Sequence, residues 1–201
     1  MREKVIIDDE EPVEIINRAR PSVPPEWYIP YENTPLGVPP MADFGSGYRY
    51  NITGLTHDVR GFPTARPDEI EPFNERLIRK ISMNRAEISI TEHFMTEDAE
   101  ITIIAYGCVA RSAKRAVLQA REQGIPVGLL KLTTLWPFVR GEMEKILPGT
   151  RLFIVPEMNM GQLSREVKRV NRGIARVITL NKVDGTIIMP QEILQKIMEV
   201  A

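Results

Sequence analysis

The second half of the chain alternates between short apolar runs and longer segments with helical periodicity. The runs are rich in Val, Ile and Leu and lack the polar alternation of a half-exposed strand, which is typical of strands buried on both faces. The expected strands cover residues 99–107, 125–132, 151–157 and 175–182. The expected helices cover residues 109–124, 138–149, 161–171 and 190–200. This alternation predicts an α/β fold, an open and mostly parallel sheet with helices on both faces.

The first part of the chain is dense in proline, glycine and aromatic residues from Pro12 to Pro72. Because proline fixes φ and holds its predecessor extended, we expect residues 1–66 to form an extended segment between domains. The β-rich stretch from Tyr50 to Thr53 predicts one or two short strands within it. The segment has too many aromatic residues for a solvated tail, so we expect their rings to pack on a surface. These residues are Trp27, Tyr28, Tyr31, Phe44, Tyr48 and Tyr50.

After Pro67 the apolar residues recur at helical spacings, with Glu early in the segment and Arg and Lys later. This order of charges suits the helix dipole, and the pattern predicts one long amphipathic helix over residues 67–97. His93 would lie in its last turn, as an ordinary charge or a solvent-facing residue. Residues 98–201 then make up the α/β domain. The apolar positions of the helix are Ile70, Phe73, Leu77, Ile81 and Ile88.

Composition excludes several classes of protein. A hydrophobic content of 43% with 26% charged residues is ordinary for a globular domain, and a net charge of −1 predicts neither nucleic acid nor an anionic membrane as partner. No apolar run approaches the ~20 residues of a membrane span. The acidic start lacks a secretory signal and reads as part of a longer protein. With Cys108 as the single cysteine, we expect a reducing cytoplasm and no iron–sulfur cluster within the chain.

The carboxyl ends of parallel strands are where ligands usually bind, so the first such turn is a candidate site. Gly107 precedes a helix but is not part of a GxGxxG or Walker motif. It either allows a tight turn or opens a helix that binds an anion. Cys108 follows it, and without a neighbouring histidine we expect a buried, inert thiol rather than a nucleophile.

The next two strand ends carry polar residues that are candidates for an interface. Hydroxyl groups and an indole after the second strand either contact a ligand or subunit, or cap the helix and wedge into the core. A carboxylate directly after the third strand either pairs with a helix N-terminus or forms a salt bridge to another chain. As a general acid or base it lacks a histidine nearby in the sequence. The candidates are Thr133, Thr134, Trp136, Glu157, Asn159 and Gln162.

The segment GLTHDVRGFPT, residues 54–64, gathers several reactive residue types between two glycines. His57, Asp58 and Arg60 are candidates for a catalytic group, since a close turn brings such side chains together. A structural network that holds the irregular segment in place explains the same residues equally well. Both interpretations stay open from the sequence alone.

Several of these motifs resemble the alpha subunit of 2-oxoacid:ferredoxin oxidoreductases, whose C-terminal domain is similar to that of transketolase. The resemblance is carried by residues 99–117, 124–138, 152–163 and 190–194, in the family's order. GLTHDVRGFPT followed by ERLIRKI matches the family's glycine–His–Asp–glycine segment before its long helix, and residues 1–9 resemble the exit from its thiamine-type domain. The motifs are most similar to 2-oxoglutarate-type enzymes but do not determine the substrate.

The resemblance implies a fragment that works within a larger enzyme. The whole enzyme would use thiamine diphosphate, magnesium and [4Fe–4S] clusters to convert a 2-oxoacid to an acyl-coenzyme A, with electrons passing to ferredoxin. The family's substrate loop has no counterpart here, so no cofactor is expected in this chain. The implied partners are a beta subunit and the N-terminal domain of the alpha chain.

Two alternatives remain beside this reading. One is the C-terminal domain of another thiamine enzyme, of the transketolase or 2-oxoacid dehydrogenase type. The other is a stand-alone interaction module that binds an anion at the sheet edge near Thr133 and Glu157. If the N-terminal domain of the alpha chain is missing, the face against which Trp27, Tyr31 and Phe44 would pack is exposed, which predicts a homodimer or a poorly ordered N-terminal stretch.

Overall fold

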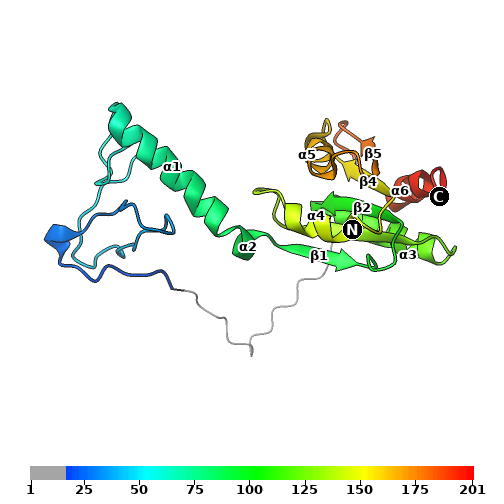
Figure 1. The fold of residues 1–201 in the computed structure, drawn as a ribbon, viewed down its shortest axis with the longest axis horizontal. Helices are drawn as coiled ribbons and strands as arrows, with labels where there is room; N and C mark the ends of the chain where they lie inside the picture. Colours follow the sequence, from blue (N-terminus) through cyan, green and yellow to red (C-terminus); the bar gives the residue numbers. More distant parts are fainter. Residues whose placement is uncertain (1–16) are drawn as a thin grey trace. The chain divides into compact units, whose positions relative to one another are not determined.

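The computed structural model describes residues 17–201 of the chain. Residues 1–16, with the resemblance noted for residues 1–9 and the first part of the proline-rich stretch, lie outside the described part. The contacts within the chain divide it into two compact units, a first unit of Met1–Met83 and a second unit of Asn84–Ala201. The second unit holds the whole sheet, from β1 in green to β5 in orange (Figure 1).

The sheet of the second unit has five strands in the order β1-β3-β2-β4-β5. The strands are β1 (Thr91–Phe94), β2 (Ile101–Tyr106), β3 (Val127–Leu132), β4 (Leu152–Glu157) and β5 (Arg176–Asn181). β1 pairs antiparallel with β3, and the remaining neighbours are parallel. The α/β class and the four predicted strands are confirmed. The order of the strands was not predicted from the sequence. The chain places β3 on one side of β2 and then returns to place β4 on the other side.

Helices cover both faces of this sheet, as the unbroken apolar strands predicted. They are α3 (Gly107–Arg121), α4 (Arg140–Ile146), α5 (Gln162–Asn171) and α6 (Pro190–Met198), while the short helix α2 (Arg85–Ile88) precedes β1 and has no buried residue. Ile103 and Ile104 are neighbours on β2 and are both fully buried, but they belong to different cores. Ile103 packs with α3 and α6, while Ile104 packs with α4 and α5. The sheet therefore separates two hydrophobic cores, because successive side chains of a strand point to opposite faces.

The predicted helix over residues 67–97 is too long. Helix α1 spans Pro67–Met83, and the chain continues as the short helix α2 and then as β1. His93 thus lies in a strand, where it opposes Leu130 of β3, and not in the last turn of a helix. The helix ends because the sequence after Met83 loses its 3.6-residue apolar period, and the backbone pairing with β3 outweighs the local helix propensity of residues 84–97.

The described part of the first unit holds α1 and the short 3₁₀ helix η1 (Pro25–Trp27), and no strand is formed between residues 17 and 83. The short strands predicted near Tyr50 to Thr53 are therefore wrong. The pairing there is one isolated bridge between His57 and Pro63. Side chains replace a neighbouring strand as hydrogen-bond partners, since the Asn51 amide Nδ2 donates to the Gly61 carbonyl at 2.6 Å.

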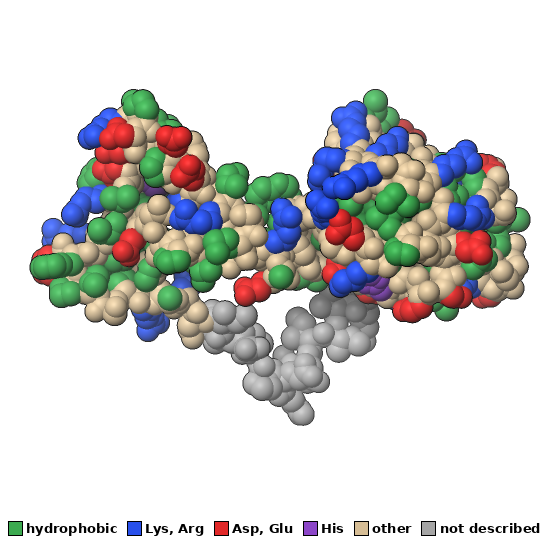
Figure 2. All heavy atoms as spheres, in the orientation of Figure 1, with side chains coloured by type: hydrophobic (Ala, Val, Ile, Leu, Met, Phe, Trp, Pro, Cys, Tyr) green, Lys and Arg blue, Asp and Glu red, His purple; other side chains and the backbone are tan. Residues whose placement is uncertain are grey.

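The aromatic residues of the first unit are partly packed and partly exposed. Tyr28 is buried, and its ring makes edge-to-face contacts with Tyr48 and Tyr50 at centroid distances of 5.1 and 6.3 Å. In contrast, Trp27 is 76% exposed and Phe44 is 87% exposed. Hydrophobic side chains accordingly appear across the visible surface of this unit, on the left of Figure 2. The predicted packing of the aromatic rings holds for the tyrosines and fails for these two residues.

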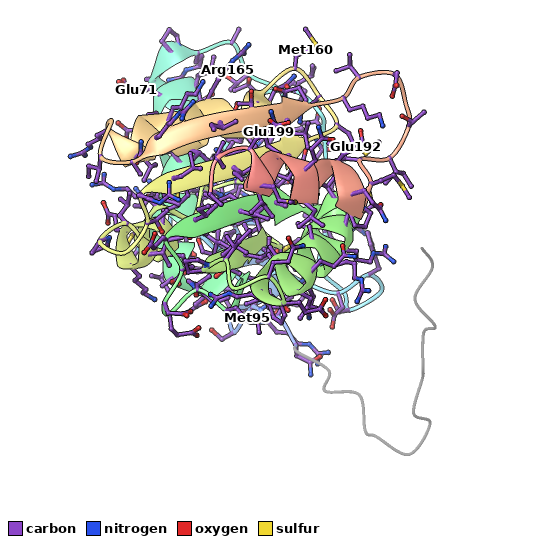
Figure 3. The ribbon with its side chains drawn as sticks, turned by 90° about the vertical axis from the view of Figure 1, so that its right-hand side faces the viewer. Glu71, Met95, Met160, Arg165, Glu192 and Glu199 are labelled. Carbon is purple, nitrogen blue, oxygen red and sulfur yellow. The ribbon has the colours of Figure 1, made fainter. Side chains whose placement is uncertain are left out.

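The start of α6 predicts a pH-dependent contribution to stability. The Glu192 carboxylate accepts the Met189 backbone N–H at 2.7 Å and pairs with Lys182 at 3.1 Å, and these contacts hold the pKa of Glu192 below its usual value (labelled in Figure 3). The folded state therefore favours the charged carboxylate. Its stabilising effect is complete above the unfolded pKa and is lost as the pH falls through the lower folded pKa.

We expect Glu192→Gln to lower the thermal midpoint at pH 6 and to have a smaller effect on it at pH 3, because the pKa of Glu192 is lowered in the folded state. The thermal unfolding of the wild type and of Glu192→Gln is measured at several pH values between 3 and 6. Glu122→Gln, at an exposed position, is the matched control and is expected to leave the midpoint unchanged at either pH. A difference between the wild type and Glu192→Gln that stays constant with pH would contradict the role given to this carboxylate.

Candidate functional site

The strand order places the topological switch point of the sheet between the carboxyl ends of β2 and β4. The helix that follows β2 lies on one face of the sheet and the helix that follows β4 lies on the other. In open α/β sheets a switch point is the usual position of a ligand site. The two connections at this switch point are Tyr106–Gly107–Cys108 and the loop from Glu157 to Gln162.

Side chains of the protein itself bridge these two connections. The Asn159 amide Nδ2 donates to the Tyr106 hydroxyl at 2.9 Å, and the Cys108 sulfur lies 3.9 Å from the Met158 sulfur. Gly107 has a φ of +56°, which supports the tight-turn interpretation of this glycine. Cys108 is exposed, so the expected burial of its thiol is wrong. It occupies the outer side of the first turn of α3, whose buried side begins at Val109 and Ala110.

Glu157 ends β4 and caps the next helix. Its side chain is fully buried, and its two carboxylate oxygens accept the backbone N–H groups of Leu163 at 2.8 Å and Ser164 at 3.0 Å. These groups lie in the first turn of α5, where N–H groups have no partner within the helix. Of the two roles considered for this carboxylate, the structure has the one at a helix N-terminus. Its atoms do not reach the surface.

Asn159 and Gln162 belong to the same loop. The Asn159 Oδ1 accepts the backbone N–H groups of Gly161 at 2.8 Å and Gln162 at 3.2 Å, while the Asn159 carbonyl accepts from the Asn181 amide at 3.0 Å. Met160, labelled in Figure 3, is 70% exposed between them. The polar residues that the sequence placed at this edge therefore hold the loop, and Gln162 presents its own side chain at the surface.

At the end of β3, Thr134 ties the loop to the segment before β1. Its hydroxyl donates to the Ile88 carbonyl and accepts the Ile90 backbone N–H, and the Ile90 carbonyl accepts from both Thr133 and Thr134. Trp136 is 67% exposed, so it is not wedged into the core. This exposure leaves a contact with a ligand or with a neighbouring subunit as the remaining interpretations of Trp136.

In the first unit, His57 and Asp58 stabilise a tight loop. The His57 ring is 6% exposed and packs between Tyr31 and Phe73, at centroid distances of 4.1 and 4.7 Å. The Asp58 Oδ1 accepts the backbone N–H groups of Arg60 at 2.8 Å and Phe62 at 3.0 Å. The His57 ring contacts the backbone of Asp58 and not its carboxylate, since the His57 Nδ1 donates to the Asp58 carbonyl at 2.8 Å.

The three candidate side chains do not contact one another in the described part of the chain. The Asp58 carboxylate orients neither His57 nor Arg60 through a side-chain contact, and the Arg60 side chain is exposed. The His57 ring is oriented by the Asp58 backbone carbonyl instead. The arrangement corresponds to the structural network that the sequence left as an alternative.

Sequence reasoning missed two polar residues with notable positions. Tyr106 is the last residue of β2, at the switch point of the sheet. Its hydroxyl group follows five buried positions of that strand, and this change from apolar to polar was a usable signal. Arg76 is 6% exposed on α1, yet in sequence it is one of several basic residues and carried no signal. Within residues 17–201 no three His, Cys, Asp or Glu side chains gather into a metal-binding group. In the same range no helix has the length and apolar content to cross a membrane.

Comparison with known proteins identifies the family. Residues 99–193 match the model of the pyruvate:ferredoxin oxidoreductase core domain II. The chain is also 44% identical, over 200 residues and 99% of its length, to the KorA subunit of 2-oxoglutarate synthase from Methanothermobacter thermautotrophicus. The chain belongs to the 2-oxoacid:ferredoxin oxidoreductase family. The resemblance that the motifs carried is thereby confirmed, including its 2-oxoglutarate synthase-like alpha subunit.

Other members of the 2-oxoacid:ferredoxin oxidoreductase family extend this comparison. Over 134 residues, or 67% of its length, the chain is 40% identical to the VorB subunit of ketoisovalerate oxidoreductase from Methanothermobacter marburgensis, and it covers 38% of that protein. A solved 2-oxoglutarate:ferredoxin oxidoreductase from Magnetococcus marinus, with 2-oxoglutarate, coenzyme A and succinyl-CoA bound, matches 92% of the chain. The match has a TM-score of 0.77 and 25% identity, and covers 32% of that chain. The chain spans about half the length of the KorA relatives, 53% of the first.

Proposed function

We propose that the chain is part of a 2-oxoglutarate:ferredoxin oxidoreductase, an enzyme that decarboxylates a 2-oxoacid oxidatively. In this reaction the acyl group passes to coenzyme A, the carboxylate leaves as carbon dioxide, and the electrons reduce ferredoxin. The observation that carries the proposal is the 44% identity to KorA across 99% of the chain. The likeness to the Magnetococcus marinus enzyme supports it at the level of structure.

Within that enzyme the chain acts as a scaffold that packs catalytic parts together and has no activity by itself. The switch point between β2 and β4 supports this role, because polar groups there already have partners inside the chain. Glu157 caps α5, and Asn159 joins the loop to Tyr106. The exposed Trp136 offers an apolar contact for a neighbouring subunit at the same edge of the sheet.

The cofactors of such an enzyme would be held elsewhere. Thiamine diphosphate is bound through magnesium, and a [4Fe–4S] cluster requires several cysteines. Residues 17–201 do not fit either group, since they offer no cluster of metal-binding side chains, and the whole chain has a single cysteine. We assign these cofactors to a beta subunit and to the N-terminal domain of the alpha chain. Coenzyme A and ferredoxin are then partners of the whole complex.

Reconstitution tests this proposal. The alpha subunit that contains this chain is produced together with its beta partner, and 2-oxoacid-dependent reduction of a viologen dye is measured in the presence of coenzyme A. We expect activity with 2-oxoglutarate from the complex and none from the 201-residue chain alone. Because the chain also matches VorB, 2-oxoisovalerate is the competing substrate, and a preference for it would move the assignment to that subtype. A folded, cofactor-loaded complex without activity toward any 2-oxoacid would refute the proposal.

A further inference from the structure

The first unit contains a cavity of about 200 Å³ that none of the contacts above explains. It lies between α1 and the segments around Tyr31 and His57, entirely within residues 31–76. Two aromatic side chains, Tyr31 and Phe73, form its apolar walls, and Arg76 contributes a guanidinium to its lining.

Arg76 is buried without an acidic partner. Its side chain has one hydrogen bond, from NH1 to the Gly37 carbonyl at 3.2 Å, and lies 5.8 Å from the centre of the Phe73 ring. No carboxylate within residues 17–201 forms an ion pair with it. Burial lowers the pKa of Arg76, the neighbouring Arg79 lowers it further, and Tyr31 opposes this effect. An uncompensated buried cation is costly, so its remaining N–H groups favour an anion.

Three acidic residues line the cavity, and their carboxylates already have partners. The Asp58 Oδ1 accepts the backbone N–H groups of Arg60 and Phe62. Asp68 is bound by Arg66 through both of its oxygens, at 3.3 and 2.7 Å. Glu69 accepts the Thr64 hydroxyl at 2.5 Å and lies 3.5 Å from Arg66. These acidic side chains leave the Arg76 guanidinium free of a counter-charge. They also disfavour a ligand with a high negative charge.

Two further polar side chains line the same cavity. His57 uses Nδ1 to donate to the Asp58 carbonyl, and in that tautomer Nε2 is an acceptor, so His57 offers no hydrogen to an anion. Asn33 accepts a hydrogen bond from Arg79 through Oδ1, which leaves its Nδ2 hydrogens to be donated. A planar guanidinium with an amide beside it matches the geometry of a carboxylate better than that of a phosphate.

We propose that this cavity binds the carboxylate of a small organic acid, with Arg76 as its counter-charge, Asn33 as a second donor and the apolar body against the Tyr31 and Phe73 side chains that line the cavity. The site belongs to the first unit and makes no use of the enzymatic reaction proposed above. Its failure or success in a binding experiment therefore leaves the proposed function untouched.

The test uses the 201-residue chain and three probes: propionate, its neutral isostere propionamide, and inorganic phosphate. Binding is followed by NMR shifts of the His57 ring and of the Gly37 and Val59 amides. We expect saturable binding of propionate, at least about tenfold weaker binding of propionamide, and no binding of phosphate. Equal affinities for propionate and propionamide, a preference for phosphate, or no binding of propionate would each overturn the proposal.

Variants identify the site. Arg76→Gln is expected to weaken propionate binding at least about tenfold, while Arg49→Gln, the same change at an exposed position of the same unit, leaves it unchanged. Because Arg76→Gln removes a buried side chain and can unfold the unit, Asn33→Asp is the second variant. It keeps the acceptor for Arg79, supplies a carboxylate beside Arg76, and should abolish propionate binding without lowering the thermal midpoint. Undiminished binding in either folded variant would refute the site.

Discussion

Replacement of Glu157 by alanine is expected to lower the free energy of unfolding of the second unit by about 4 kcal/mol, or the thermal midpoint by about 16 °C. The carboxylate is fully buried and accepts two backbone N–H groups in the first turn of α5. Without it both donors stay buried and unpaired, and the negative charge that suits the helix N-terminus is lost. Urea and thermal denaturation followed by circular dichroism measure the change.

Two variants separate these contributions. Glu157→Gln keeps one acceptor oxygen and should lose about half as much stability. Glu166→Ala lies on the same helix, where the carboxylate makes only an exposed ion pair with Arg169, and should cost less than about 0.5 kcal/mol. If Glu157→Ala cost no more than Glu166→Ala, the capping role of the buried carboxylate would be wrong.

Gly61→Ala is expected to destabilise the first unit by about 4 kcal/mol. Gly61 has a φ of +89°, and a Cβ atom added there would lie 2.2 Å from the Asn51 carbonyl oxygen and 2.9 Å from the Tyr31 ring. Neither the backbone of residue 51 nor the Tyr31 ring can move without breaking the contacts of the His57 loop, since Asn51 bonds to the Gly61 carbonyl and Tyr31 packs on His57. Near-ultraviolet circular dichroism, which reports the packed tyrosines, should lose its signal at a lower temperature.

Gly47→Ala is the matched control for this substitution. Gly47 has the same φ of +89°, but no atom lies within 4 Å of the added Cβ. It should therefore cost only the backbone strain, about 1–2 kcal/mol. Equal losses from the two substitutions would mean that φ alone, and not the close approach of Asn51, explains why residue 61 is glycine.

The sheet was predictable from sequence because its strands are buried on both faces. The runs Ile101–Tyr106 and Leu152–Glu157 show neither the 3.6-residue polar period of a surface helix nor the two-residue alternation of a half-exposed strand. The order of strands followed from no local pattern, since it depends on which runs pair over long sequence distances. β1 was missed for a related reason: its four residues gain their pairing from β3 and not from their own periodicity.

The candidate sites were harder to predict than the fold. The sequence placed polar residues at strand ends correctly, but it could not tell whether Glu157 faces a helix or a partner, because both uses require the same residue. Cys108 was expected to be buried, and its exposure depends on how α3 is rotated against the sheet. Arg76 was hidden among like charges, since only the folded unit separates a buried arginine from an exposed one.

The two tryptophans have a practical consequence for work on the assembled enzyme. The chain has only Trp27 and Trp136, one in each unit, and both side chains lie largely in water. Their fluorescence in the separate chain will be red-shifted and open to quenching by iodide. A substitution of either indole by phenylalanine leaves the other as the sole emitter. Each unit thereby has its own spectroscopic signal for the moment when a partner covers it.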